Sequence, residues 1–255
     1  MGADIDPLAG AVIAFDLDGT LVDTAPDLGG TLNAILAERG LPTVPLGDIR
    51  AMIGHGARAL IERGFSAAGR AVSPAEMTPL FDRFIDLYMA RIADESRPFP
   101  GVLAALDELV GDGAILAVCT NKRTNLSVAL LDALGMTQRF AAVVGPDAAG
   151  VSKPDPRHLT FAIEAAGGQL GRALMVGDSK TDLDAARAAG APIALVSFGY
   201  TEIPASELGA DALIGHFDEL PAAARRLLAR RRAAISPVLP GPVLPGPVLP
   251  GRTDA

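Results

Sequence analysis

Two aspartates, separated by one residue, follow an apolar run near the beginning of the chain. The run Ala11–Phe15 is typical of a buried strand, and Asp16 and Asp18 come directly after it. Side chains at positions i and i+2 of an extended chain lie on the same side, so both carboxylates are expected at the end of one strand. Open α/β sheets bind their ligands at this end of the strands. Because two carboxylates there need a cation between them, they predict a site for Mg²⁺ and a phosphate group.

These two carboxylates could carry out the two halves of phosphate-ester hydrolysis. Asp16 lies at the strand tip, where it could attack phosphorus and form an acyl phosphate that water cleaves. Asp18 could protonate the departing alcohol oxygen and afterwards accept a proton from the hydrolytic water. The main-chain carbonyl of Asp18 could also face the metal. Acidic residues at strand ends are common without any function, so the pair by itself favours neither interpretation.

Polar residues at two further places fit the same chemistry. Thr120, Asn121 and Lys122 follow the apolar run 114–119, and their hydroxyl, amides and ammonium could bind phosphate oxygens. Lys153 lies before a proline in a polar loop. It could offset the negative charge of the nucleophile and of the phosphoryl group. A solvated surface lysine is the simpler interpretation of Lys153 alone.

Another strand end supplies more acidic residues. Asp178 and Ser179 follow the run 173–176, and Asp182 opens the next helical pattern. Asp178 is suited to ligate a hard cation alongside Asp16. Asp182 could stabilise its helix as a first-turn acid or as the N-cap. We therefore expect Asp182 and Ser179 to lie around the metal ligands rather than to bind the metal themselves.

The spacing of apolar residues divides the rest of the chain into two patterns. From about Val22 to Pro98 the periodicity is helical, and no strand is expected. After Pro98, helical and extended patterns alternate, which predicts a parallel sheet with helical crossovers. The expected strands are 11–15, 114–119, 140–144, 173–176 and 192–196. The expected helices are 28–40, 57–63, 75–81, 84–92, 102–110, 126–134, 158–166 and 182–189, with a last helix that carries the basic run 225–232.

The two patterns predict an α/β protein whose doubly wound parallel sheet is interrupted by an all-helical insert. Residues 1–22 and 98–235 would form the core. Residues 23–97 would form a helical cap over the aspartate pair, with hinges at its borders. Residues 236–255 would be a flexible tail, because Pro237–Gly251 is the sequence Pro-Val-Leu-Pro-Gly repeated three times. A proline-rich recognition ligand is the alternative for this tail.

Composition limits the classes of function. The 255 residues are 49% apolar and 20% charged, which is typical of a soluble globular protein with a sizeable core. A net charge of −8 disfavours nucleic acid as a partner. The single cysteine, Cys119, lies in an apolar run, so we expect a packed side chain rather than a nucleophile or a disulfide. No secretion leader and no membrane-spanning run is recognisable, so a cytoplasmic monomer or homodimer is expected.

The motifs occur in an order that resembles the haloacid dehalogenase-like hydrolase superfamily. The resemblance rests on Asp16-Leu17-Asp18-Gly19-Thr20-Leu21, Thr120, Lys153-Pro154 and Gly177-Asp178-Ser179-Lys180-Thr181-Asp182. It implies a Rossmann-like core, a helical cap of the family's first type and Mg²⁺ as cofactor. It also implies Asp16 as nucleophile and metal ligand, Asp18 as acid/base and carbonyl ligand, and Asp178 as metal ligand. Thr120 and Lys153 would steady the phosphoryl group.

Within that superfamily the chain resembles the phosphoglycolate phosphatases. Three segments carry this second resemblance: Val22–Leu28, Ile53–Gly56 and Thr120–Lys122. It implies hydrolysis of a small anionic phosphate ester, 2-phosphoglycolate first, to glycolate and phosphate. The alternatives are a phosphomutase similar to β-phosphoglucomutase, or a phosphatase of pyrophosphate, a nucleoside monophosphate or a sugar phosphate.

Substrate contacts are also expected outside the reacting residues. Thr20, Asn121 and Lys122 would contact the ester. His55 or Arg58, from a glycine-containing segment of the cap, could bind a carboxylate of the substrate. An exposed histidine at the start of a helix is an equally simple interpretation of His55.

Overall fold

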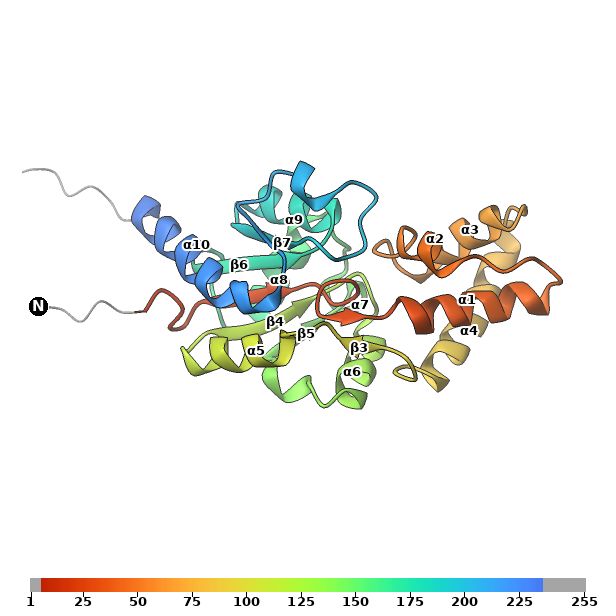
Figure 1. The fold of residues 1–255 in the computed structure, drawn as a ribbon, viewed down its shortest axis with the longest axis horizontal. Coiled ribbons are helices and arrows are strands. Elements are labelled where there is room, and N and C mark those ends of the chain that lie inside the picture. Colours follow the sequence, from red (N-terminus) through yellow and green to blue (C-terminus); the bar gives the residue numbers. More distant parts are fainter. Residues whose placement is uncertain (1–5, 236–255) are drawn as a thin grey trace, which may run out of the picture.

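The computed structural model describes residues 6–235, so the expected tail at 236–255 lies outside the described residues. Within the described part, six parallel strands form one sheet in the order β5-β4-β1-β6-β7-β8 (Figure 1). The chain winds outward from β1 in both directions, through β4 on one side and β6 on the other. The alternating pattern of the sequence predicts this doubly wound sheet, and the prediction is confirmed, but the sixth strand, at 212–214, was not among the five expected. The strands are β1 (Val12–Phe15), β4 (Ile115–Cys119), β5 (Ala142–Val144), β6 (Ala173–Gly177), β7 (Ile193–Val196) and β8 (Ala212–Ile214).

Helices cover both faces of this sheet, which explains why its strands are apolar throughout. On β1, Ile13 and Phe15 belong to the hydrophobic cluster of one face, and Val12 and Ala14 to that of the other. Cys119 is buried in the second cluster, as expected for a packed cysteine. The first face is covered by α5 (Val102–Gly111), α6 (Thr124–Ala133) and α10 (Leu220–Ile235), and the second by α8 (Pro156–Ala165) and α9 (Lys180–Ala189). Shorter helical turns are α7 (Pro146–Ala149), Thr137–Arg139, Leu170–Arg172, Ala205–Glu207 and Phe217–Glu219.

A group of helices packs together at the end of the molecule that lies away from the N-terminus (Figure 1). These helices are α1 (Ala25–Glu38), α2 (Leu46–Arg50), α3 (Ala57–Ala67) and α4 (Pro74–Ala90). We call residues 25–90 the helical insert. Leu126 and Tyr200, from outside the insert, belong to its hydrophobic cluster, so the insert is packed against the sheet-bearing part of the chain. The division into core and cap domains at residues 23 and 97 stays a prediction.

The last helix of the insert differs from the prediction. A single helix, α4, replaces the two helices expected at 75–81 and 84–92. Ser73 and Glu76 form a capping box at its start, and the helix continues through Pro79. The proline removes one main-chain hydrogen bond, but Leu80, Phe84 and Tyr88 recur every fourth residue and all pack in the same cluster. Their burial maintains one continuous helix.

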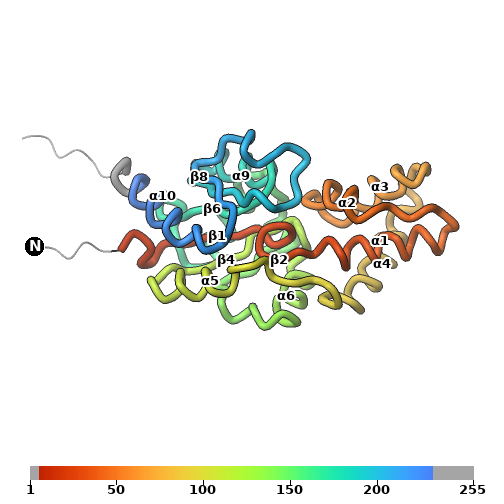
Figure 2. Tube along the Cα trace, in the orientation of Figure 1, coloured from red at the N-terminus to blue at the C-terminus, as the bar shows by residue number. Residues whose placement is uncertain are grey.

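The two segments that join the insert to the rest of the chain lie side by side (Figure 2). They form an antiparallel pair of two-residue strands, β2 (Val22–Asp23) and β3 (Arg97–Pro98). The expectation that no strand occurs between 22 and 98 was therefore wrong at both borders, because two residues are too few to show a strand pattern. Asp27, fully buried in α1, strengthens the connection, since Ser96 donates to it from both its main-chain nitrogen (2.7 Å) and its hydroxyl (2.6 Å).

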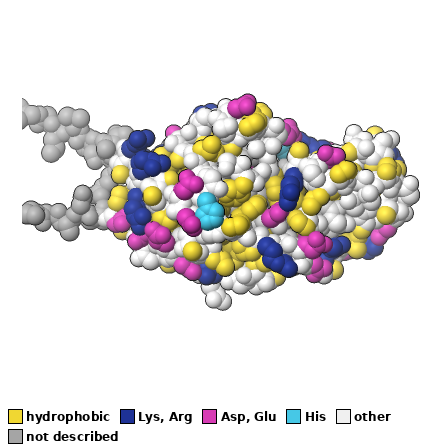
Figure 3. Space-filling view, viewed as in Figure 1, with side chains coloured by type: hydrophobic (Ala, Val, Ile, Leu, Met, Phe, Trp, Pro, Cys, Tyr) yellow, Lys and Arg dark blue, Asp and Glu magenta, His cyan; other side chains and the backbone are white. Residues whose placement is uncertain are grey.

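Charged side chains of both signs are interspersed on the face drawn in Figure 3.

Part of the basic run on α10 forms ion pairs or hydrogen bonds with neighbouring groups. Arg225 forms ion pairs with Asp112 and Glu108, and Arg231 donates to the carbonyl oxygens of Leu170 and Gly171. Across residues 6–235, every helix is either too short or too polar to cross a membrane.

Candidate active site

The predicted functional residues gather at the carboxyl ends of β1, β4 and β6. Asp16 directly follows β1, Thr120 follows β4, and Asp178 follows β6. β1 pairs with β4 on one side and with β6 on the other. Connections leave this point toward opposite edges of the sheet, and such a switch point is where doubly wound sheets bind ligands. The topology therefore brings together three residues that are more than 50 positions apart in the sequence.

Three buried carboxylates form a cluster at this point. One oxygen each from Asp16, Asp178 and Asp182 lies within 4.8 Å of the others. Lys153 supplies the positive charge, with its Nζ 2.8 Å from Asp16 Oδ1 and 2.7 Å from Asp182 Oδ1. Its side chain is only 1% exposed, so the simpler interpretation of Lys153 as a solvated surface lysine is wrong.

The electrostatics of this cluster favour a cation. Burial raises the pKa of Asp16 to about 6, although the neighbouring Lys153 opposes the shift. Burial, Asp182 and Asp16 together hold the pKa of Asp178 well above its ordinary value. Three carboxylates and one ammonium leave a formal charge of −2 when all four groups are ionised. A divalent ion with a preference for oxygen ligands would neutralise that charge, so the donor set fits a hard cation.

Asp182 belongs to the carboxylate cluster and also holds the surrounding loop in place. Its Oδ2 accepts hydrogen bonds from the main-chain nitrogen of Ser179 (3.1 Å) and from the Ser179 hydroxyl (2.8 Å). This is a capping box at the first turn of α9. The other oxygen of Asp182 accepts from Lys153. Asp182 thus fixes the lysine and the loop after β6, and whether it stays outside the metal shell remains a prediction.

The turn after Asp18 packs tightly against the loop of Asp178. Gly19 has φ of +85°, and a Cβ there would lie 2.5 Å from Asp178 Oδ2 and 2.8 Å from the Tyr200 ring, so only glycine fits. The Thr20 hydroxyl donates to Asp178 Oδ1 at 3.2 Å. Thr20 therefore positions a candidate metal ligand here, and its contact with substrate stays a prediction.

Asp18 lies beside the acidic cluster but has its own cation. Lys122 Nζ lies 2.7 Å from Oδ1 and 2.9 Å from Oδ2 of Asp18. Burial alone would lower the pKa of Lys122, but Asp18 and Tyr88 outweigh that effect and raise it. The Asp18 carboxylate thus pairs with a lysine rather than with the acidic cluster. Metal ligation by its main-chain carbonyl stays a prediction.

Thr120 and Asn121 connect the loops around the site. The Thr120 hydroxyl accepts from the main-chain nitrogen of Lys122 at 3.2 Å. The side-chain Nδ2 of Asn121 donates to the main-chain carbonyls of Gly54 and Lys153, both at 3.1 Å. Its Oδ1 accepts from the main-chain nitrogen of Lys153 at 2.9 Å. Asn121 therefore joins the helical insert to the loop that carries the buried lysine. The expected contact between Asn121 and substrate stays a prediction.

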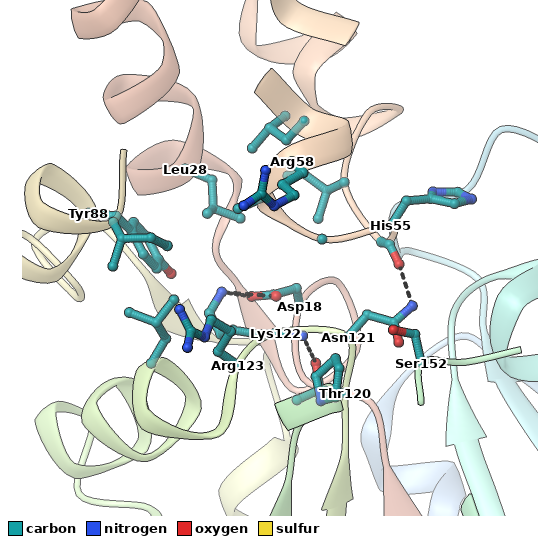
Figure 4. A pocket seen from close by; sticks show the side chains of 18 of the residues that line it. Asp18, Leu28, His55, Arg58, Tyr88, Thr120, Asn121, Lys122, Arg123 and Ser152 are labelled. Atoms are coloured by element: carbon teal, nitrogen blue, oxygen red, sulfur yellow. Dashed lines mark hydrogen bonds and ion pairs between the residues drawn. The ribbon is translucent and has the colours of Figure 1, made fainter. Parts of the chain in front are cut away.

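A cavity of about 460 Å³ lies between the loops at the strand ends and the helical insert (Figure 4). The side of the sheet contributes Asp16, Asp18, Thr120 and Lys122. The side of the insert is mostly apolar and is lined by Leu28, Leu60, Phe81, Phe84, Ile85 and Tyr88.

The side chains of the two residues of the insert that are expected to contact substrate, Arg58 and His55, point in different directions. Arg58 points into the cavity in Figure 4, with its guanidinium 4.6 Å from the Phe81 ring centroid. His55 is exposed, and its ring points away from Asp18 in the same view although the residue lines the cavity. This geometry favours Arg58 for a substrate anion.

Two polar residues of the cavity were missed by the sequence reasoning. Arg123, next to Lys122, reaches the cavity from the start of α6, and Tyr88 reaches it from α4 (Figure 4). Arg123 could have been found as the continuation of Thr120–Lys122. Tyr88 could not, because its position in a helical apolar stripe predicts only packing.

Comparison with known proteins agrees with this geometry. A family model described as haloacid dehalogenase-like hydrolase matches residues 13–196. The chain is 58% identical to a phosphoglycolate phosphatase of Caulobacter vibrioides over 221 residues, which covers 87% of this chain and 93% of the relative. It is 49% identical to a phosphoglycolate phosphatase of Mesorhizobium japonicum, with 82% and 92% covered.

A solved structure has the same fold. It is described as a predicted phosphoglycolate phosphatase from Haemophilus somnus, and it superposes with a TM-score of 0.78 at 30% identity. The match covers 84% of this chain and 97% of that one. With the matched family model spanning Asp16, Thr120, Lys153 and Asp178, this chain belongs to the haloacid dehalogenase-like hydrolase family.

Proposed function

We propose that this protein is a Mg²⁺-dependent phosphatase of a small phosphate monoester, with 2-phosphoglycolate as the first candidate substrate. The observation that carries the proposal is the buried cluster of Asp16, Asp178 and Asp182 at the switch point of the sheet, with Lys153 in contact with Asp16 and Asp182. The names of the relatives support the choice of substrate.

Asp16 is the nucleophile in this proposal. One of its carboxylate oxygens attacks phosphorus, the bond between phosphorus and the ester oxygen breaks, and the electron pair leaves with that oxygen. The product is an aspartyl phosphate and an alcohol. Water then attacks the phosphorus of the aspartyl phosphate, which releases phosphate and restores the Asp16 carboxylate. Lys153, 2.8 Å from Asp16, offsets the charge that collects on the phosphoryl oxygens.

Asp18 is the acid and base of the two steps. It gives a proton to the leaving alcohol oxygen and later takes one from the attacking water. Both of its oxygens accept from Lys122, so one of them has to leave the lysine before the proton can move. An anionic group of the substrate is a suitable new partner for that ammonium.

The metal site uses the acidic cluster. Asp16, Asp178 and the carbonyl of Asp18 would hold Mg²⁺, which neutralises charge on the phosphoryl oxygens when it is bound. Thr120, directly after β4, would bind a phosphoryl oxygen.

The size of the cavity favours a second candidate. About 460 Å³ is more than a two-carbon ester requires, and it lies within the range of sites for larger ligands. A phosphatase of a sugar phosphate or a nucleoside monophosphate therefore belongs in the same experiment. A phosphomutase similar to β-phosphoglucomutase would use the same residues but return the phosphoryl group to a sugar.

The test is a panel of phosphate esters, assayed with and without Mg²⁺ and ranked by kcat/KM. We expect 2-phosphoglycolate to rank first and release of phosphate to require the metal. A sugar phosphate ranking far above it would overturn the substrate but not the reaction. Isomerisation of a sugar phosphate without net phosphate release would indicate the mutase. Release that is indifferent to metal would contradict the reaction itself.

A further inference from the structure

The cavity wall contains a buried hydroxyl that has no hydrogen-bond partner. Tyr88 is fully buried, and its Oη makes no hydrogen bond of normal geometry with any of the described residues. Among the described residues, one buried polar atom each of Thr24, Arg91, Thr137 and His158 also lacks a partner, but of this set only Tyr88 lines the cavity. Burying an unpartnered hydroxyl is costly, so phenylalanine would serve packing alone better.

The surroundings of this hydroxyl are suited to an anion. Lys122 Nζ lies 4.8 Å from the centroid of the Tyr88 ring, and the hydroxyl end of the tyrosine points toward Lys122 and Asp18 in Figure 4. Burial raises the pKa of Tyr88 to about 12, so the hydroxyl keeps its proton at neutral pH and is available as a donor. A phenol donor beside an ammonium matches the acceptor oxygens of a carboxylate.

The position relative to the reacting residues fixes which part of the substrate is involved. The phosphoryl group has to reach Asp16, whereas Tyr88 belongs to α4 of the helical insert, and Lys122 lies between Tyr88 and Asp18 in Figure 4. We propose that Tyr88 is a substrate-specificity residue, whose hydroxyl, together with Lys122, binds the second anionic group that the ester carries besides its phosphoryl group. This inference rests on the proposed function and assigns a role that sequence reasoning gives to no residue of α4.

The experiment compares the wild-type enzyme with Tyr88→Phe on two substrates. 2-Phosphoglycolate carries a carboxylate, and acetyl phosphate carries no second anionic group. We expect KM for 2-phosphoglycolate to rise by roughly tenfold or more, with kcat changed by less than about threefold. For acetyl phosphate, kcat/KM is expected to stay within about twofold of the wild type, because that substrate makes no use of the hydroxyl.

Phe84→Leu is the matched control, because Phe84 lies in the same helix and cavity wall, stacks on Tyr88 at 6.1 Å and carries no hydroxyl. It should change kcat/KM for both substrates by about the same factor. If Tyr88→Phe changed kcat/KM for both substrates by the same factor, or changed neither, Tyr88 would have only a packing role and the inference would be overturned.

Binding measurements separate this inference from the reaction. The Kd of 2-phosphoglycolate for the wild type and for Tyr88→Phe, measured without turnover in the absence of Mg²⁺, should differ in the same direction as KM. Identical Kd values would count against Tyr88 even if the enzyme hydrolyses 2-phosphoglycolate. Failure of the wild type to hydrolyse acetyl phosphate or any ester with Mg²⁺ would instead contradict the proposed phosphatase, and a weaker Kd for Tyr88→Phe would still support the binding role.

Discussion

The two walls of the cavity are built in opposite ways. The sheet side contributes Asp16, Asp18 and Lys122, and each of these carboxylates forms an ion pair with a buried lysine, Asp16 with Lys153 and Asp18 with Lys122. The side of the helical insert is mostly apolar, with His55, Arg58 and Tyr88 as its polar members. The strands on the sheet side are held in place by hydrogen bonding to neighbouring strands, and β1 has a partner on each side. The opposite wall consists of helices that two short linkers join to the rest of the chain. This difference suggests that the sheet determines the reaction and the helices determine the substrate.

The strongest test of this division replaces the nucleophile. Asp16→Asn should lower kcat by at least about a thousandfold on every ester, because the amide cannot form the aspartyl phosphate. The measurement is phosphate release from 2-phosphoglycolate and acetyl phosphate under saturating Mg²⁺.

The matched control is Asp132→Asn, an exposed acid on α6, which should leave kcat unchanged. Retention of full activity by the Asp16 variant on either substrate would show that Asp16 is not the nucleophile.

A second test uses the pH dependence of stability in the metal-free protein. Asp16 has a folded-state pKa of about 6 against an ordinary value of 3.8. The folded protein therefore binds this proton more tightly than the unfolded chain, and the contribution of Asp16 to stability falls as the pH rises between about 4 and 6. Urea unfolding at pH 4.5 and pH 7 should show a larger loss of stability for the wild type than for Asp16→Asn, by about 2 kcal/mol.

Mg²⁺ should reduce that difference, since it competes with the proton for the carboxylate. Parallel pH curves for the two metal-free proteins would show that burial of Asp16 carries no such penalty.

The smallest effect is expected on the side of the insert. Arg58→Ala should raise KM for 2-phosphoglycolate by about tenfold while kcat stays near the wild-type value, because only binding of the distal anion is weakened. Acetyl phosphate should be hardly affected. A fall of kcat on both substrates would instead mean that Arg58 takes part in the chemical step, which would weaken the contrast between the two walls.

The same contrast explains what could be predicted from the sequence. Asp16, Thr120 and Asp178 each follow an apolar run, and strand ends of a parallel sheet meet at one edge, so their proximity follows from local patterns. The alternation of strands and helices likewise predicts the sheet. The continuity of α4 through Pro79 could not be predicted, because it depends on tertiary burial of Leu80 and Phe84.

The role of Tyr88 depends on the same tertiary packing. The sequence indicates an apolar helical stripe around this residue, but not that the stripe forms the wall of a cavity. The partners of Asp18 and Asn121 were also unpredictable, since each joins loops that are distant in sequence.

The paired linkers have a practical consequence for engineering. Because Val22 lies opposite Pro98 and Asp23 opposite Arg97, the chain departs from the sheet and comes back to it across a single ladder spacing of about 5 Å. A tight turn of a few residues can bridge such a gap. We therefore expect that a turn, or the corresponding helices of a relative, can be grafted between these positions without displacing β1 or the strands beside it.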